Sequence, residues 1–512
     1  MTIHLSIVLF VPLALALVGA MLPRRLAPIA GVVGAGIVLA YAIVLLADFD
    51  AGANRLQYVT DDAWIDELGI RYSLGIDGLN LWLIALAAVL FFAAALWTAL
   101  RPVAERPGLF AFHMLLCETA VLGALMAQDL ALFVLFFDLM LVPIYFLLGQ
   151  WGGPERIAAT IKLVIYTLVG SLLMLAAAVA TAVLGGREAG EGLTFSLARL
   201  SQVDLPESTQ KWLFAGFALA FLIKMPAFPF QGWMPDGYRN MPLPVLVFFS
   251  GVVSKVAVYG FLRIVAPLFP DAMADFQTLI LVLSVLSILY GSAQAFTQTN
   301  TRLILGYSSM AQLGFMTLGI FSLEPQGATG AVLHMVNHGL VVAPLLLIIV
   351  LLAERSGGSD DIRDMGGLAF RAPVLAGLFL ITSLATLAMP GSANFVGEFY
   401  ILLGAFRSEM VFSILAFTGV AMASVYMLRM YIRAMHNRQG PAVESREMSL
   451  RDGVVIAPLV AAIIAFALVP QVALEDQERS ASRAIQTAQR AGDEGAAASA
   501  AERAQAQEEP TP

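Results

Sequence analysis

Charged side chains are scarce in this chain of 512 residues. Asp, Glu, Lys and Arg make up 13% of it, whereas soluble domains carry about 25%. Hydrophobic residues make up 59%, so too few polar side chains remain to cover a water-exposed surface. The composition therefore excludes an ordinary soluble protein. It predicts an integral membrane protein whose charges lie in short connections and at the C-terminal end.

Cysteine is almost absent. Cys117 is the single cysteine, which excludes internal disulfides and all-thiolate iron–sulfur or zinc sites. The five histidines show no haem-ligand pattern, and the sequence has no phosphate loop, nucleotide-binding motif or nucleophile triad. We therefore expect no cofactor and no metal in this chain, and no means of moving electrons or hydrolysing ATP. Any uphill transport must draw its energy from partner proteins or from another ion gradient.

Long apolar runs dominate what is present. A membrane-spanning helix needs about 20 apolar residues, and runs of that length recur along the whole chain. The predicted fold class is an all-α integral membrane protein with about fourteen transmembrane helices. The expected spans lie near residues 4–22, 28–48, 79–100, 108–127, 130–149, 160–184, 212–231, 243–268, 275–296, 303–322, 328–353, 372–403, 410–432 and 453–474.

The basic residues predict how these spans are oriented. Loops after odd-numbered spans, with their flanks, carry about fifteen Lys or Arg, against about seven in the even-numbered loops. Basic loops stay in the cytoplasm. Arg24 and Arg25 follow the first apolar run rather than precede it, which argues against a signal peptide. We therefore expect both termini on the outer, periplasm-like face.

Spans four to eight and nine to thirteen predict two five-span units. Because five is odd, consecutive units cross the membrane in opposite directions, which is the inverted-repeat plan of many transporters. We expect three N-terminal spans with an external loop (1–107), a first repeat (108–270), a second, inverted repeat (271–435), a last span (436–474) and a polar tail (475–512). The tail composition is compatible with a surface helix in its first part and with disorder at its end.

Each unit contains one interrupted span. The first stretch, 221–236, carries Lys224 and breaks at Pro226 and Pro229, and the second, 387–399, breaks at Pro390 and carries Glu398. Broken apolar segments at corresponding places in two halves indicate a transport pathway. The alternative is that each proline only kinks a packed span. An ionisable residue beside each break favours the pathway, because a charge is costly to place inside a membrane.

Further ionisable residues lie within the expected spans. The principal candidates for proton translocation are Asp138, Lys224, Lys255 and Glu398, with Lys162, His334, His338 and Glu118 in support. A carboxylate near an ammonium favours charge on both groups, so protonating one changes the other. Histidines between them titrate near neutral pH. Such a row predicts a lateral proton wire. The alternatives are static ion pairs for some members and, for the two histidines at i, i+4 spacing, a metal site.

Eight motifs give the chain a resemblance to the antiporter-like membrane subunits of NADH:quinone oxidoreductase (respiratory complex I). The motifs are Leu-Gly-Ile-Asp-Gly at 74–78, Phe-Phe-Asp-Leu-Met-Leu-Val-Pro-Ile-Tyr-Phe-Leu at 136–147, Lys-Met-Pro-Ala-Phe-Pro-Phe at 224–230, Trp-Met-Pro-Asp at 233–236, Tyr-Gly-Phe-Leu-Arg at 259–263, Gly-Tyr-Ser-Ser-Met-Ala-Gln-Leu-Gly-Phe at 306–315, His-Met-Val-Asn-His-Gly at 334–339 and Phe-Val-Gly-Glu-Phe at 395–399. Within that family the M-type subunit (mitochondrial subunit 4 counterpart) is favoured by Glu398, where L-type and N-type chains usually carry lysine.

The resemblance implies one proton-translocating module that is driven by redox chemistry in other subunits. It implies partners among the other membrane subunits, especially the L-like and N-like ones, a bacterial inner membrane, and no nucleic acid. FMN, iron–sulfur clusters and quinone would belong to partner subunits. The key residues of the family match Asp138, Lys224, Lys255 and Glu398.

Three positions depart from the family pattern. Asp138 stands where glutamate is usual, and Gln231 and Gln312 stand where histidine is common. Glutamine cannot take up a proton at ordinary pH, so a water bridge is the simpler interpretation at these two positions. The alternative functions are a subunit of an Mrp-type sodium/proton antiporter or of a membrane-bound hydrogenase, and a purely structural subunit.

Overall fold

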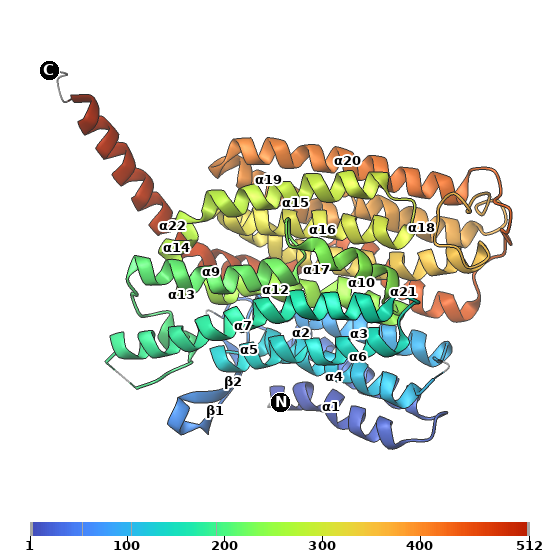
Figure 1. The fold of residues 1–512 in the computed structure, drawn as a ribbon, viewed down its shortest axis with the longest axis horizontal. Helices are drawn as coiled ribbons and strands as arrows, with labels where there is room; N and C mark the ends of the chain where they lie inside the picture. Colours follow the sequence, from blue (N-terminus) through green and yellow to red (C-terminus); the bar gives the residue numbers. More distant parts are fainter. Residues whose placement is uncertain (1–3, 54, 104, 191, 509–512) are drawn as a thin grey trace.

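The computed structural model describes residues 4–508 except 54, 104 and 191. Figure 1 shows the long helices side by side with roughly parallel axes. Within the described ranges, eleven helices or helix pairs are long and apolar enough to cross a membrane. The shorter α1 (Leu5–Met21) and two interrupted segments bring the crossings to the expected fourteen. The predicted all-α membrane fold is therefore confirmed.

The N-terminal group consists of three helices and a small hairpin. Helices α2 (Ala27–Asp48) and α3 (Leu81–Leu100) pack with α1 against α4 (Pro107–Met126). Between α2 and α3 lies an antiparallel hairpin of β1 (Gln57–Ile65) and β2 (Ile70–Ile76), joined through η1 (Asp66–Leu68). Arg71 donates to Asp61 across the hairpin at 2.7 Å and holds the pKa of that carboxyl below its usual value. The expected external loop is thus an ordered hairpin.

The first five-span unit runs from α4 to α13. Its other members are α5 (Leu130–Leu139), α6 (Leu141–Trp151), α7 (Arg156–Glu188), the short α8 (Leu197–Leu200), α9 (Glu207–Lys224), η2 (Gln231–Trp233), α10 (Met234–Asn240), α11 (Leu243–Phe248), η3 (Phe249–Val253), α12 (Ser254–Gly260), η4 (Phe261–Val265) and α13 (Ala266–Leu268). The segments α11 to α13 make one continuous span. Within it, η3 and η4 are π-helical.

The second five-span unit runs from α15 to α20 and follows the short α14 (Pro270–Asp275). It consists of α15 (Gln277–Thr297), α16 (Thr301–Phe321), α17 (Pro325–Arg355), the interrupted pair α18 (Pro373–Thr386) and α19 (Ala393–Ser408), and α20 (Met410–Met435). In both units the interrupted span is the fourth. The two charged residues differ in place, because Lys224 ends the helix before its break whereas Glu398 lies after its break, within α19.

The chain closes with α21 (Leu450–Leu468) and α22 (Gln471–Glu508). Helix α21 ends before Pro470, earlier than the predicted residue 474, because proline lacks a backbone N–H and disfavours helix in the residue before it. Helix α22 lies across the end of the bundle and then projects beyond it (Figure 1). It extends the surface helix expected for the tail as far as residue 508, and residues 509–512 lie outside the described ones.

Both chain ends reach the same end of the bundle. The Tyr72 hydroxyl of the hairpin donates to Ser6 at the start of α1 at 3.0 Å. The Trp82 indole at the start of α3 donates to Asp476 of α22 at 2.9 Å. An even number of crossings requires this shared face. Helices α16, α17 and α11 to α13 occupy the centre, where nearly every residue is buried.

Candidate functional site

Lys224 is held at the end of α9 by the break that follows it. The helix ends at this residue, and the Ile223 carbonyl that loses its helical partner accepts a hydrogen bond from the Trp233 indole at 3.0 Å. The Lys224 amine donates to the Phe137 carbonyl at 2.6 Å and lies 3.9 Å from the centre of the Phe137 ring. A carbonyl and a ring face both favour the ammonium form. The interrupted helix therefore presents a buried amine to α5.

Asp138 follows Phe137 on α5 and is the carboxylate near this amine. It interacts electrostatically with Lys224, although the two groups do not form an ion pair within 4.0 Å in the described part of the chain. The Ser171 hydroxyl of α7 faces the carboxylate. A cavity of about 10 Å³ adjoins Lys224 and Thr167, which is about the space that one water molecule needs. The structure therefore brings Asp138 and Lys224 together without direct contact.

Lys255 lies at the centre of the membrane bundle, between the two π-helical turns η3 and η4. It is fully buried, and its amine donates to the Ser250 carbonyl. A π-helical turn leaves backbone groups displaced from the regular ladder and is common at functional sites. His334 and His338 of α17 interact electrostatically with Lys255. Lys255 therefore lies close enough to the histidine pair for the charges of these groups to affect one another.

The histidine pair leads to Glu398 through Gln312. The rings of His334 and His338 are 6.2 Å apart between centroids. His334 Nε2 lies 2.5 Å from Gln312 Oε1 on α16, and the Gln312 side chain also lies beside the Glu398 carboxyl. The close packing of α17 on α19 fixes this arrangement, since a Cβ on Gly397 would meet His334 at 2.9 Å. Gln312 therefore lies between two titratable groups, although its own amide cannot take up a proton.

Two of the supporting candidates lie apart from this row. Lys162 forms an ion pair with Asp236 of α10 at 2.8 Å, and both side chains are more than a third exposed. This geometry matches the static ion-pair alternative for Lys162. Glu118 is completely buried in α4, and neither of its carboxyl oxygens has a hydrogen-bond partner in the described part of the chain. Among the described residues, no Lys or Arg forms an ion pair with Glu118.

A chain of hydroxyl groups that no sequence motif selects lies next to the row at Lys255. The Tyr238 hydroxyl of α10 donates to Ser250 Oγ at 3.0 Å, and Ser250 Oγ lies 3.2 Å from Ser309 Oγ. Ser250 is also the residue whose carbonyl accepts from Lys255. The signal available in the sequence was the motif that contains Ser309. Serine and tyrosine are too common in helices for that signal to select them.

The candidate side chains lie on neighbouring helices across the bundle, in two interacting sets: Asp138 with Lys224, and Lys255 with the two histidines and, through Gln312, Glu398. We call this series of side chains the row. Helices α9 and α12 are in contact, α17 contacts η3, and α17 and α16 both contact α19. The order along the row is Asp138, Lys224, Lys255, His338, His334, Gln312 and Glu398. Among the described residues, no three His, Cys, Asp or Glu side chains gather in a metal-binding arrangement. Groups of this kind can hand on protons when water links them.

Comparison with known proteins finds a family that matches most of residues 108–435, where two repeats are expected. Residues 127–423 match the family model described as NADH:quinone oxidoreductase/Mrp antiporter, transmembrane. A relative named NADH-quinone oxidoreductase subunit M, from Mycobacterium tuberculosis (strain CDC 1551 / Oshkosh), is 35% identical over 513 positions, which cover 92% of each chain.

Solved structures share the arrangement. A chain of respiratory complex I from Thermus thermophilus with bound NADH is 30% identical, with a TM-score of 0.85 over 94% of this chain and 100% of that one. A chain of the Mrp complex from Dietzia sp. DQ12-45-1b is 21% identical, with a TM-score of 0.82 over 95% of this chain and 98% of that one. The second likeness concerns the fold alone.

Proposed function

The chain belongs to the transmembrane family of NADH:quinone oxidoreductase and Mrp antiporter subunits, and we propose that it is an M-type proton-translocating membrane subunit of a respiratory NADH:quinone oxidoreductase. The observation that carries this proposal is the row of ionisable groups from Asp138, which is half-buried, to Glu398, which is buried like Lys224, Lys255 and the two histidines. A charged group at a span centre costs about 3 kcal/mol on insertion scales. Packing alone gives no reason to keep Lys224, Lys255 and Glu398 there.

The proposed step begins with the Asp138 and Lys224 pair. When Asp138 takes up a proton, its charge is lost and the Lys224 ammonium loses an electrostatic partner. The buried ammonium then releases a proton toward Lys255, through water and the groups between α9 and α12. Lys255 passes a proton through the histidines to Glu398. The Tyr238, Ser250 and Ser309 hydroxyls supply a second connection, from α10 to the Lys255 side of the row.

The energy for this movement comes from outside the chain. We propose that partner subunits hold FMN and iron–sulfur clusters, reduce quinone, and drive the charge changes in the row. The L-like and N-like membrane subunits are the expected neighbours. The excess of basic residues in odd-numbered loops supports an orientation in a bacterial inner membrane with both termini on the periplasmic face.

The decisive test compares Lys224→Ala with Lys211→Ala in the assembled complex. Lys211 lies on the same helix, but it is exposed and paired with Asp275 at 2.9 Å. We expect Lys224→Ala to lower proton pumping and NADH:quinone turnover by about tenfold or more, and Lys211→Ala to leave both unchanged. NADH oxidation by the peripheral flavin, measured with an artificial acceptor, should survive in both variants. Full coupled activity in an assembled Lys224→Ala complex contradicts the proposal.

Co-purification separates this function from that of an Mrp-type antiporter, whose fold is shared. The tagged chain is purified gently from native membranes and assayed for NADH oxidation and for flavin and iron–sulfur absorption. Their presence supports the redox-driven role. A colourless eluate that holds other antiporter subunits and lacks NADH oxidation supports a cation/proton antiporter instead.

A further inference from the structure

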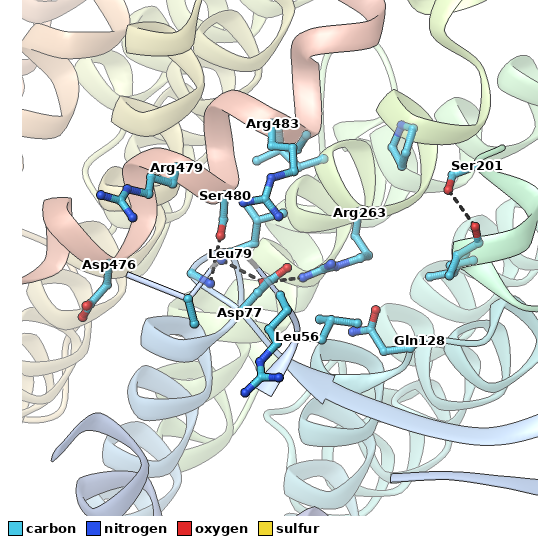
Figure 2. A pocket seen from close by; sticks show the side chains of 18 of the residues that line it. Leu56, Asp77, Leu79, Gln128, Ser201, Arg263, Asp476, Arg479, Ser480 and Arg483 are labelled. Atoms are coloured by element: carbon cyan, nitrogen blue, oxygen red, sulfur yellow. Dashed lines mark hydrogen bonds and ion pairs between the residues drawn. The ribbon is translucent and has the colours of Figure 1, made fainter. Parts of the chain in front are cut away.

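A pocket of about 360 Å³ lies at the end of the bundle that carries the hairpin, separate from the ionisable row. Its walls come from the loop after α2, the turn 77–79 before α3, the residues around α8, the end of the span α11 to α13, and α22. Figure 2 shows α22 passing over the turn that holds Asp77 and Leu79. Helix α2 ends at Asp48, α3 begins at Leu81 and α13 ends at Leu268. The pocket therefore lies level with the ends of these spans, the depth at which lipid headgroups are expected.

Helix α22, which closes one side of the pocket, is held in place by close backbone contact. A Cβ on Gly78 would meet the Asp476 carbonyl of α22 at 1.9 Å, so only glycine allows this approach. The Gly78 amide donates to Ser480 Oγ at 3.1 Å, and Trp82 donates to the Asp476 carboxylate at 2.9 Å. Helix α22 is thus held on the turn through Asp476 and Ser480, one helical turn apart, so specific contacts close this side of the pocket.

Arginine dominates the charged lining. Four arginines line the pocket, against two aspartates: Arg55, Arg263, Arg479 and Arg483, with Asp77 and Asp476. Arg263 is positioned by Asp77 at 2.6 Å and by the Tyr259 hydroxyl at 2.7 Å, and its side chain is only 11% exposed. In Figure 2, Arg263 and Arg483 extend toward Asp77 from different walls. Arg479 donates to the Gly52 carbonyl at 3.2 Å, and neither it nor Arg55 forms an ion pair within the described residues. The pocket therefore carries a positive surplus.

The uncharged part of the lining is largely apolar, with Gln128, Ser201, Ser480 and Thr487 as its polar members. Phe49, Leu56, Leu197, Leu262 and Pro267 contribute to the walls. A cavity of this size accommodates a small organic ligand, and guanidinium groups recognise phosphate through paired N–H donors. Positive and apolar walls together suit a phosphate ester. Its phosphate would contact the arginines, and its hydrocarbon part would pack against the apolar side chains.

We propose that this pocket binds a phosphate-bearing anion, presented by an anionic phospholipid headgroup or as free phosphate. The bound anion bridges α22 to the loop before the hairpin, through Arg479 and Arg483 on one side and Arg55 on the other. The site goes beyond the proposed proton translocation, because none of its residues belongs to the row from Asp138 to Glu398.

Direct binding tests the proposal without using enzymatic activity. The full chain, purified with its co-purifying subunits, is dialysed to equilibrium against tritiated dihexanoyl phosphatidylglycerol and, in a separate arm, against ³²P-phosphate. The test variant is Arg55→Gln with Arg479→Gln. The control is Arg490→Gln, an exposed arginine on the same helix outside the pocket. Arg483→Gln serves as an independent test variant if the double variant lowers the yield of folded protein.

We expect saturable binding that weakens about tenfold in each test variant, stays unchanged in the control, and weakens as salt rises. Binding of phosphatidylglycerol alone identifies a lipid ligand, and equally tight binding of inorganic phosphate identifies the free anion. Equal binding by the wild type and both test variants overturns the proposal. So does the absence of saturable binding of either probe, or equal affinity for the zwitterionic dihexanoyl phosphatidylcholine.

Discussion

The Lys224 amine is held in place by groups that carry no charge. Its hydrogen bond goes to the Phe137 carbonyl, and its other close neighbour is the Phe137 ring. Asp138 acts on it only across space. Neutralising Asp138 therefore changes the electrostatic balance at Lys224 and leaves its position unchanged. This separation of geometry from charge makes the pair suitable for isosteric substitution.

The first prediction concerns the charge and length of residue 138. We expect Asp138→Asn to lower proton pumping and coupled quinone reduction by about tenfold, since the amide cannot take up a proton. Asp138→Glu keeps the carboxylate and should retain most activity. Both are measured as NADH-driven proton uptake in membrane vesicles, normalised to assembled complex. Equal activity of Asp138→Asn and the wild type would remove Asp138 from the proton pathway.

The second prediction concerns Gln312, the connection between His334 and Glu398. Gln312→Leu leaves a buried histidine nitrogen without its partner, which costs about 1–3 kcal/mol, and it interrupts the row. We expect a large loss of coupled activity, and recovery of most of it in Gln312→His, which restores a polar titratable group. The control is Gln294→Leu on the neighbouring α15, which is outside the row. Activity of Gln312→Leu equal to that of the control would make Gln312 a packing residue only.

At the scale of elements, the row depends on how closely α17 approaches η3. A Cβ on Gly339, the residue after His338, would meet the Gly251 carbonyl at 2.6 Å and Leu86 at 2.6 Å. Backbone atoms cannot yield as a flexible side chain does. The close contact between these two elements therefore sets the separation between Lys255 and the histidines.

The third prediction follows from this contact. Gly339→Ala should destabilise the protein by about 1–3 kcal/mol through overpacking and lower the amount of folded protein in the membrane. Gly377→Ala is the matched control, because a Cβ at Gly377 in α18 meets no atom within 4 Å and alanine is the better helix former. Thermal unfolding in detergent and membrane yield give the comparison. A Gly339→Ala variant as stable as Gly377→Ala would show that α17 can shift freely.

The elements predicted from sequence are those whose signal is long and apolar. The span expected at 243–268 coincides with α11 to α13, and the breaks near Pro226 and Pro390 occur where expected. The candidate residues of the row could be selected from the sequence because each charge is costly in an apolar run; their role in proton transfer stays a prediction. The tyrosine and serine hydroxyls beside Lys255 gave no such signal. The β1–β2 hairpin was missed because its strands alternate weakly and carry several charges.

At the scale of the whole molecule, α22 joins parts that are far apart in sequence. It contacts α13, α14 and α17, and it reaches the turn before α3 through Trp82 and Gly78. Its buried side is a stripe at helical spacing: Ala473, Gln477, Ala481, Ile485 and Ala488, all at most 1% exposed. Four of these residues are small or polar, so the stripe gave little hydrophobic signal. For that reason the sequence predicted only a surface helix and a disordered end.

The last prediction tests whether this stripe holds α22 on the bundle. Ala481→Glu places a carboxylate where the side chain is completely buried, and an unpaired buried charge costs several kcal/mol. We expect α22 to detach and trypsin to cleave after Arg479 and Arg483, which are protected in the wild type by the helix and its contacts. Gln486→Glu introduces the same charge at an exposed position of α22 and should leave the digestion pattern unchanged.

Because α22 carries no residue of the ionisable row, detachment should leave that row intact. Any loss of coupled activity should then follow from loss of neighbouring subunits. Co-purification of those subunits with the Ala481→Glu chain measures that loss, and a wild-type digestion pattern in this variant would show that the stripe does not hold the helix.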